Sequence, residues 1–484
     1  MLKKFTSEFK DNYFITAFVL VLIAAFLRLY RLAGFVTFLG DQGRDAIVIR
    51  RILTFEHFPA IGAPTSVGQV YLGPFYYYFI APWLAIFNFN PLGLAVGVAL
   101  VSSAFILISY VLIKDLFDKR IAIVTVVMMV FAEVLIDFSR YSWNPNLLPF
   151  FSFFLIYAFI KARKAGNWKY YGVSGALLSF AVQLHYIALV FVIPAAILVV
   201  YDFIQERKKL MQQIKNVGMF AAGFGFFSLP LLIFDLRHDF LNTKSFMSLF
   251  KSQEAVSAGA VSEVLQTFST LNRYAFAQEF HPLILIFLFV LIVTFTVLRF
   301  RANTHESSIL LFFTLSVIGI SLYSGPKYVH YFTIVYILYY LVIAYFLVKA
   351  LWNKRFGMLI AVFLTVFIYM NFLQYRFIHG EPSNQIETSR RVARIIFDNT
   401  TVETYKVAGL PDKFSDSTYR YFLELWGKRS LERDATEQAD ELFVVCQDDC
   451  KPIGDPLWDI AYFAPREIVG VWSVEGVKIY KLIR

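Results

Sequence analysis

Long apolar runs separated by short basic loops fill the first three quarters of the chain. Runs of this kind are typical of helices that cross the hydrocarbon core of a bilayer, which needs about 20 predominantly apolar residues. We predict eleven membrane-spanning helices, near Tyr13–Ala33, Leu92–Ile113, Ile121–Phe138, Asn146–Lys161, Tyr170–Leu184, Ile187–Tyr201, Val217–Phe234, Pro282–Leu298, Ile309–Tyr323, Phe332–Val348 and Met358–Leu373.

Basic residues gather in alternate loops between these runs. Positive loops face the cytoplasm in membrane proteins, so we expect the N-terminus inside and, after an odd number of helices, the C-terminus outside. No small-residue cleavage site follows the first run, which predicts that this helix remains as an anchor. The cation-rich segments are the N-terminal Lys3, Lys4 and Lys10, and then Lys114–Arg120, Lys161–Lys169, Glu206–Lys215, Arg299–Arg301 and Lys349–Arg355.

One apolar stretch, Tyr71–Phe89, does not fit this scheme. If it crossed the membrane, every later basic loop would change sides. Gly73-Pro74 and Pro82 also interrupt it. We therefore interpret it as a juxtamembrane or re-entrant element, buried in protein on the external side. The preceding stretch, Asp41–Phe58, mixes charged and apolar residues as an interfacial helix does.

The composition supports a membrane protein and excludes a soluble one. Of the 484 residues, 58% are hydrophobic, 18% are aromatic and only 17% are charged. A soluble protein of this length would carry more charge and fewer long apolar runs. The formal net charge of +10 comes from short loops, so it indicates topology and not binding of nucleic acid. We expect an integral protein of the cytoplasmic membrane.

The composition changes after about residue 375. Residues 376–484 hold 15 Lys+Arg and 18 Asp+Glu, a net charge of −3, which leaves +13 for the membrane part. Helical patterns at Ile386–Phe397 and Ser417–Trp426 predict an α/β domain together with four strand patterns, at Tyr405–Ala408, Leu442–Cys446, Glu467–Trp472 and Val477–Leu482.

The predicted fold class is therefore a polytopic α-helical membrane protein with external juxtamembrane helices and a small C-terminal external α/β domain. We place the membrane domain at residues 1–375, with its external first loop at about 34–90, and the soluble domain at 376–484. The only two cysteines, Cys446 and Cys450, lie in the soluble part. They are ordinary surface thiols unless that part faces an oxidising compartment, where a local disulfide is plausible. A structural zinc site would need two further ligands, and no second cysteine pair is present.

The segment Gly40-Asp41-Gln42-Gly43-Arg44-Asp45 follows directly on the first apolar run. Charged groups at membrane depth are expensive, so we expect these to line a wet pocket. Asp41, Arg44 and Asp45 share one face of a helix by their spacing. Asp41 is the candidate general base, because the helix dipole and Arg44 both favour the ionised form that accepts a proton. The alternative is a helix cap. Asp45 is a second catalytic candidate or an ordinary ion-pair partner of Arg44.

Further polar and aromatic residues gather in the external loops, at helix ends. Cations there suit an anionic headgroup because guanidinium geometry matches phosphate oxygens, although cations at this depth also snorkel toward lipid headgroups. Aromatic rings there could stack on a sugar or belong to the interfacial belt. The candidate phosphate-binding residues are Arg44, Arg140, His185, Arg237 and Lys327, and the candidate substrate-contacting residues are Tyr141, Trp143, Asn144, Tyr186, His330 and Tyr331.

Together these residues resemble the polytopic GT-C glycosyltransferases, in the bacterial branch related to protein O-mannosyltransferases and the lipid A aminoarabinose transferase. Those enzymes carry a catalytic Asp on juxtamembrane helices of the first external loop, a position that Asp41 matches. Gln42 departs from the Asp-Glu pair of the protein mannosyltransferases. The resemblance covers roughly residues 10–350 and includes Lys114–Arg120, Ser139-Arg140-Tyr141, Leu184-His185-Tyr186 and Lys327-Tyr328.

The resemblance implies transfer of a hexosyl or pentosyl group from a polyprenyl-phosphate donor to a hydroxyl of a lipid, glycan or protein acceptor on the external face. Asp41 would deprotonate the acceptor, cations would stabilise the leaving phosphate, and the anomeric carbon would invert. A divalent metal is needed by some GT-C enzymes and not by others. Asp41, Asp45 and His185 could supply ligands for it, so the cofactor stays open.

The alternative from another functional class is a transporter or flippase of lipid-linked sugar precursors. Transporters usually place their polar residues near the bilayer midplane and show repeated halves. Here the polar residues lie at one face and no repeat is visible, so we favour the enzyme.

Overall fold

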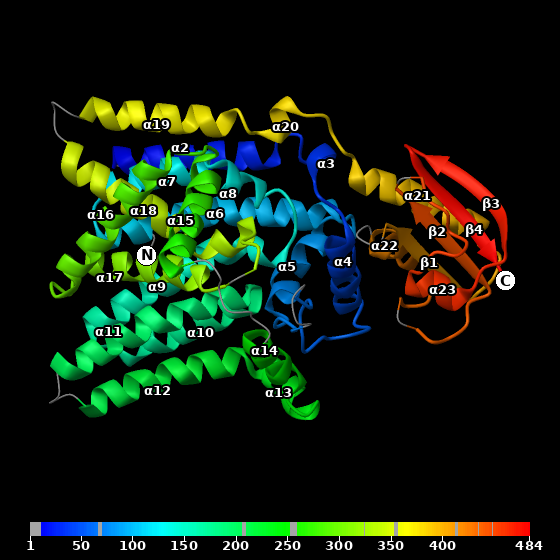
Figure 1. Cartoon of the computed structure of the whole chain (residues 1–484), viewed down its shortest axis with the longest axis horizontal. Helices are drawn as coiled ribbons and strands as arrows, with labels where there is room; N and C mark the ends of the chain where they lie inside the picture. Colours follow the sequence, from blue (N-terminus) through cyan, green and yellow to red (C-terminus); the bar gives the residue numbers. More distant parts are fainter. Residues whose placement is uncertain are drawn as a thin grey trace.

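A computed structural model of the chain describes residues 11–65, 70–205, 210–251, 259–323, 325–352, 357–411, 415–433, 435–447 and 449–484. Most of the helices run side by side in an elongated bundle, and a small sheet with its own helices lies beyond one end of this bundle (Figure 1).

A helix or helix pair occupies each predicted apolar run. Five described helices are long and apolar enough to cross a membrane, and six are if one pair bent by 68° counts as a single span. The structure thus confirms a polytopic helical membrane protein. The helices are α2 (Asn12–Leu29), α6 (Leu92–Leu116), α7 (Lys119–Phe131) with α8 (Glu133–Asp137), η1 (Asn144–Leu147) with α9 (Leu148–Ala165), α10 (Trp168–Leu184), η2 (Tyr186–Phe191) with α11 (Val192–Gln205), the bent pair α12 (Leu210–Phe227) and α13 (Leu229–Arg237), α16 (Pro282–Phe300), α17 (His305–Ser321), η4 (Val329–Ile334) with α18 (Tyr336–Leu351), and α19 (Gly357–Phe372).

The basic loops meet at one end of the bundle. Lys119 pairs with Asp11 at 3.5 Å, and Lys161 pairs with Asp115 at 2.8 Å. Arg163 pairs with Asp202 at 2.6 Å and also donates to Asn303 at 2.9 Å. Several predicted basic segments therefore share one side, and the C-terminal sheet lies beyond the opposite end (Figure 1). That the basic side is cytoplasmic stays a prediction.

Some of the basic segments predicted to share this side cannot be compared with the structure. The N-terminal Lys3, Lys4 and Lys10 lie outside the described residues, as do portions of Glu206–Lys215 and Lys349–Arg355.

The external first loop folds into short helices. Beside α3 (Leu32–Phe35) it contains α4 (Gly40–Leu53), the predicted interfacial helix, which ends before the predicted Phe58. Next comes α5 (Phe75–Ile86), with Pro82 inside it. Its 12 residues span about 18 Å, too little to cross a hydrocarbon core of about 30 Å. The helix packs between α4, α6 and α10, which agrees with a juxtamembrane element. The remaining short helices of the membrane part are α14 (Leu241–Lys251), α15 (Ala260–Phe276) and α20 (Arg376–His379).

The C-terminal part contains a four-stranded sheet in the order β1-β2-β4-β3, with β1 and β2 parallel and the other pairs antiparallel. All four predicted strands and both predicted helices are present. The elements are α21 (Gln385–Asn399), β1 (Tyr405–Leu410), α22 (Ser417–Leu425), β2 (Glu441–Cys446), α23 (Trp458–Phe463), β3 (Glu467–Val474) and β4 (Val477–Ile483).

This sheet is covered on both faces at its centre. Every residue of β1 and β2 is buried, because alternate side chains point to opposite sides and each side meets helices. β3 is an exposed edge strand. Cys446 at the end of β2 is joined to Cys450 by a disulfide, the local pairing that the sequence allowed.

Candidate active site

Asp41, Arg44 and Asp45 lie together on α4, as their spacing predicted. The Arg44 Nη1 donates to Asp41 Oδ1 at 2.8 Å, while its Nε and Nη2 donate to Asp45 Oδ1 at 3.0 and 2.8 Å. The Asp45 side chain is 0% exposed, whereas that of Asp41 is 47% exposed. Arg44 thus ties a buried carboxylate to an open one, and of the two Asp41 is the one that a substrate can reach.

Burial and neighbouring charges shift the pKa values of Asp45 and Arg44. Burial raises the pKa of Asp45, although Arg44 pulls it in the opposite direction. Burial alone would lower the pKa of Arg44, but Asp45, Tyr77 and Asp41 outweigh it and raise that pKa. Arg44 therefore carries a permanent positive charge beside Asp41, where it can stabilise negative charge that develops on a substrate.

The start of α4 is held by close packing against the C-terminal part. A Cβ atom at Gly43 would lie 2.5 Å from the backbone nitrogen of Thr418 at the start of α22, so only glycine fits there. The side chain of Gln42 accepts the backbone N–H of Leu39 at 3.0 Å and caps the helix. The residue that departs from the mannosyltransferase pattern thus has a structural role here.

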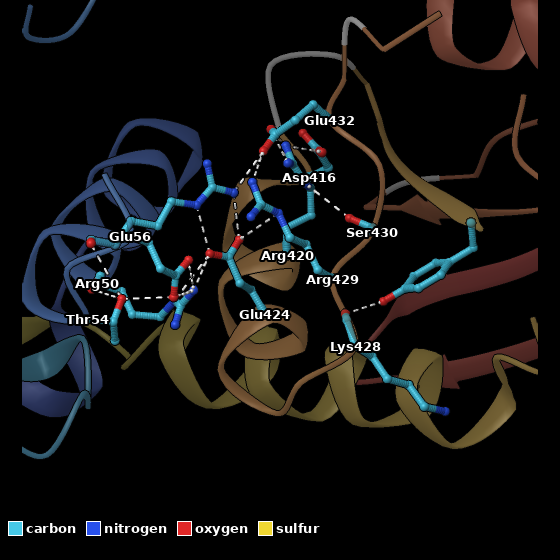
Figure 2. A network of polar contacts seen from close by, with 12 residues as sticks. Arg50, Thr54, Glu56, Asp416, Arg420, Glu424, Lys428, Arg429, Ser430 and Glu432 are labelled. Carbon is cyan, nitrogen blue, oxygen red and sulfur yellow. Dashed lines mark hydrogen bonds and ion pairs between the residues drawn. The ribbon is translucent and has the colours of Figure 1, made fainter. Parts of the chain in front are cut away.

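Farther along α4, an ion-pair network joins the same two elements. Glu424 of α22 is only 4% exposed, and its two oxygens receive Arg50 at 2.6 Å and Arg51 at 2.8 Å. Figure 2 shows Arg50 and Glu56 on the α4 side facing Glu424, with Glu432 above Glu424 in the view. Salt bridges around a buried carboxylate fix orientation, and here they fix the helix that carries Asp41.

Tyrosines from α5 and the following external loop surround the trio. The hydroxyl groups of Tyr76 and Ser142 are 2.8 Å apart. Tyr77 is near enough to Arg44 and Asp45 to affect the pKa of both. Burial raises the pKa of the Tyr141 phenol, and the charges of Asp137 and Asp41 raise it further. Tyr141 therefore stays protonated close to Asp41.

Predicted residues from three loops form one aromatic cluster beside Tyr141. The ring centroids of Tyr141 and Trp143 are 6.3 Å apart, and those of Trp143 and His330 are 5.0 Å apart. His330 in turn lies 5.3 Å from His185 and 4.5 Å from Tyr331. Burial lowers the pKa of His330 to about 4, so this imidazole is neutral at pH 7. The cluster can stack on a sugar and offer neutral hydrogen bonds.

Asn144 adds an unused amide to the same loop. Its side chain is 2% exposed, and within the described residues neither its oxygen nor its nitrogen has a hydrogen-bond partner. A buried polar group without a partner costs free energy, so such a group in a native structure needs an explanation. A bound substrate that pairs with this amide provides one.

Two of the predicted cations, Lys327 and Arg140, are already paired within the protein. Lys327 is 10% exposed and pairs with Glu263 of α15 at 2.8 Å, three residues before His330. Arg140 donates to the carbonyl groups of Leu27, Arg28 and Tyr30 at 2.8–2.9 Å and so caps the C-terminus of α2. These contacts occupy its guanidinium.

Two predicted residues belong instead to the region of α13 and α14. Arg237 is exposed at the end of α13, which Figure 1 places far from α4. The Tyr186 hydroxyl donates to the carbonyl of Tyr71 and accepts from Asn242 at 3.0 Å, so it supports the α5 loop. The structure does not bring Arg237 to Asp41, and its binding role stays a prediction.

Sequence reasoning missed several residues of this region. Tyr76 and Tyr77 were hidden in an aromatic run that looked like membrane packing, and Gly43 gave no sign of its contact with α22. Glu133 and Asp137 could have been found, because two acids inside the predicted span Ile121–Phe138 are a functional signal at membrane depth. Among the described residues, no group of three or more His, Cys, Asp or Glu side chains could hold a metal ion.

Comparison with known proteins follows this geometry. Residues 72–233 match the family model of dolichyl-phosphate-mannose-protein mannosyltransferases. No curated protein sequence matches the chain.

Solved structures resemble most of the chain. The crystal structure of ArnT from Cupriavidus metallidurans bound to undecaprenyl phosphate is 12% identical and gives a TM-score of 0.61, with 97% of each chain covered. The apo oligosaccharyltransferase of Archaeoglobus fulgidus is 14% identical with a TM-score of 0.55, and the match covers 87% of this chain and 64% of that one. The chain therefore has the fold that ArnT and the archaeal oligosaccharyltransferase share, and residues 72–233 resemble the mannosyltransferases, which confirms the resemblance drawn from its sequence.

Proposed function

We propose that this protein is a membrane glycosyltransferase that moves a sugar from a polyprenyl-phosphate donor to an acceptor hydroxyl on the extracytoplasmic face. The observation that carries the proposal is Asp41, a half-exposed carboxylate held beside a permanent cation at the first turn of a fixed helix. The ArnT structure with the same fold contains undecaprenyl phosphate, which supports a lipid-phosphate donor here.

In the proposed reaction Asp41 takes the proton of the acceptor hydroxyl. The acceptor oxygen forms a bond to the anomeric carbon while the bond from that carbon to the phosphate oxygen breaks, so the configuration inverts. The electron pair leaves with the lipid phosphate, which gains negative charge. Pre-positioned cations stabilise such charge best where water is scarce.

Arg44 is the first candidate for that stabilisation because it is already positioned beside Asp41. Lys327 is the second, since its ammonium group can exchange Glu263 for a phosphate. We propose neutral His185 and His330 as hydrogen-bond partners and the rings of Tyr141 and Trp143 as the stacking surface for the sugar. Asp45, fully buried and paired, acts by orienting Arg44. Arg140 is left out of this phosphate site because α2 uses its donors.

The test is transfer of radiolabelled sugar from polyprenyl-phosphate donors in membranes, with wild type compared with Asp41→Asn at matched expression. We expect the substitution to reduce transfer by about 100-fold or more, since general-base catalysis contributes about 10²–10⁴. Asp239→Asn, an exposed residue of the loop after α13, is the matched control and should transfer normally.

Equal transfer by wild type and Asp41→Asn would remove Asp41 as the base. Movement of intact donor across the bilayer without transfer would instead identify a transporter.

A further inference from the structure

A cavity of about 210 Å³ opens beside the start of α4. Its walls come from α8, from α20 and from the segments just before α4 and α21. Four charged residues line it, namely Glu133, Asp137, Arg140 and Arg376. Two of the predicted site residues, Arg140 and Tyr141, lie in the wall of this cavity, and the other lining residues were not predicted.

The cavity lies at a break between two helices, α7 and α8. The backbone groups freed by this break are paired with α19 and the residues after it. The amide side chain of Asn371 accepts the N–H of Glu133 at 2.7 Å, and the Tyr375 hydroxyl donates to the carbonyl of Phe131 at 2.7 Å. Broken helices at membrane depth occur where the backbone is satisfied by neighbours and lines a cavity. Asn371 and Tyr375 therefore satisfy the backbone groups at the break between α7 and α8.

The two carboxyl groups in the cavity face cations but are not hydrogen-bonded to them. Within the described residues, neither Glu133 nor Asp137 forms an ion pair or a side-chain hydrogen bond. Arg140 has its donors on α2, which leaves Arg376 as the lining cation able to donate. Two carboxylates at i and i+4, with one cation opposite, accept hydrogen bonds from hydroxyl or ammonium groups and repel a phosphate.

Tyr141 connects this cavity with Asp41. Its ring lines the cavity, and its phenol is close enough to interact electrostatically with Asp137, Asp41 and Glu133. Leu39, two residues before Asp41, lines the cavity as well. A group bound there can therefore present a hydroxyl toward Asp41 past the edge of Tyr141.

We propose that this cavity is the acceptor subsite, which binds a neutral or cationic sugar ring through Glu133, Asp137 and Arg376. The assignment rests on the proposed function and deepens it. It separates the two substrates by charge, because the anionic donor phosphate stays with Arg44 and Lys327 while the hydroxyl-rich acceptor occupies the side with the carboxylates.

The experiment compares Asp137→Asn and Glu133→Gln with wild type in three measurements. These are transfer of labelled sugar to membrane acceptors, slow hydrolysis of the donor by water in purified protein, and binding of undecaprenyl phosphate. Each substitution removes the charge that strengthens a hydrogen bond to a hydroxyl, so we expect transfer to fall about tenfold or more. Donor hydrolysis and lipid binding should stay at the wild-type level.

Asp137→Glu, which keeps the charge, should restore part of the transfer, and Asp239→Asn should behave as wild type. If hydrolysis or lipid binding falls together with transfer, the cavity serves the donor or the fold and the proposal is wrong. Unchanged transfer in both variants would equally overturn it. If the label were recovered on protein and not on a glycan, the acceptor would not be a sugar and the proposal would be wrong. A wild-type protein that neither transfers nor hydrolyses the donor would refute the proposed function itself.

Discussion

Arg44 and Asp45 form one ion pair, but the two partners depend on it differently. Asp45 is 0% exposed and receives two hydrogen bonds from the same guanidinium, whereas Arg44 is 28% exposed and has Asp41 as a second partner. A buried charge that loses its partner is strongly destabilising. The two residues should therefore respond unequally to neutral substitution.

We expect Arg44→Gln to destabilise the protein by about 2–3 kcal/mol, below the usual 3–5 kcal/mol for a broken buried pair because Arg44 keeps some contact with water. Asp45→Asn should cost clearly less, since Arg44 can still pair with Asp41. Thermal unfolding of the purified proteins in detergent measures the difference. If Arg44→Gln and Asp45→Asn unfolded at the same temperature, the buried charge of Asp45 would not need Arg44 as its partner.

Asn144 should show a conflict between stability and function. Its buried amide lacks a partner among the described residues. Asn144→Leu replaces this unpaired amide with an apolar side chain of similar size. We expect the variant to be at least as stable as wild type, with a gain of about 1 kcal/mol at most, but to lose transfer activity. A less stable variant would mean that the amide is satisfied by water in the resting protein. Ser142→Ala serves as the control for a hydroxyl that does have a partner.

At the scale of elements, α4 is positioned as much by the C-terminal part as by the membrane helices. Gly43 fits against α22, and Glu424 holds Arg50 and Arg51. The catalytic candidate Asp41 therefore lies on a helix whose orientation is set by a segment nearly 400 residues away in the sequence.

Glu424→Gln should loosen α4 without unfolding the membrane part. We expect faster amide hydrogen exchange in Gly40–Leu53 and a lower rate of transfer at saturating donor, while donor affinity changes little. Glu387→Gln, which breaks an exposed ion pair with Arg390, is the matched control. If exchange in α4 is unchanged, the glycine contact alone holds the helix.

Low pH should weaken the same contact between α4 and α22. The neighbouring arginines hold the pKa of Glu424 below its usual value, and that of Glu432 falls from 4.5 to about 2. Lowered carboxylate pKa values stabilise the docked state above the ordinary pKa, and this stabilisation is lost as pH falls toward the folded one. Docking should therefore weaken from about pH 4.5 downward, and less so in Glu424→Gln.

The sequence predicted most of these elements because each carries a local signal. Periodic apolar residues marked the strands and α22, and Pro82 with the basic loops argued correctly against a span at α5. The six-residue helix α23 was missed, because one and a half turns give no periodic pattern.

Side-chain direction could not be predicted in the same way. Arg140 and Arg237 stand in the expected loops, yet one turns back to cap α2 and the other faces outward. Loop position depends on spacing along the chain, whereas direction depends on contacts between distant segments.

At the scale of the whole molecule, the C-terminal sheet and the basic loops lie toward opposite ends (Figure 1). Our prediction that the basic side is cytoplasmic would place the disulfide between Cys446 and Cys450 on the oxidising exterior. In intact cells we expect a membrane-impermeant maleimide to label the protein only after treatment with an impermeant reductant. If labelling required permeabilised cells, the disulfide would lie on the cytoplasmic side and the predicted topology would be wrong.

The ion pairs among the basic loops bear on how a lipid enters. The contact of Lys119 ties α7 to the start of α2, and those of Lys161 and Arg163 tie α9 to α6 and α11. Helices tied at one level can separate only by tilting about it, so the gap between them widens with distance from it. The prenyl chain of the proposed donor, moving in sideways from the bilayer, would thus find its opening at the far level, on the side where α4 lies (Figure 1).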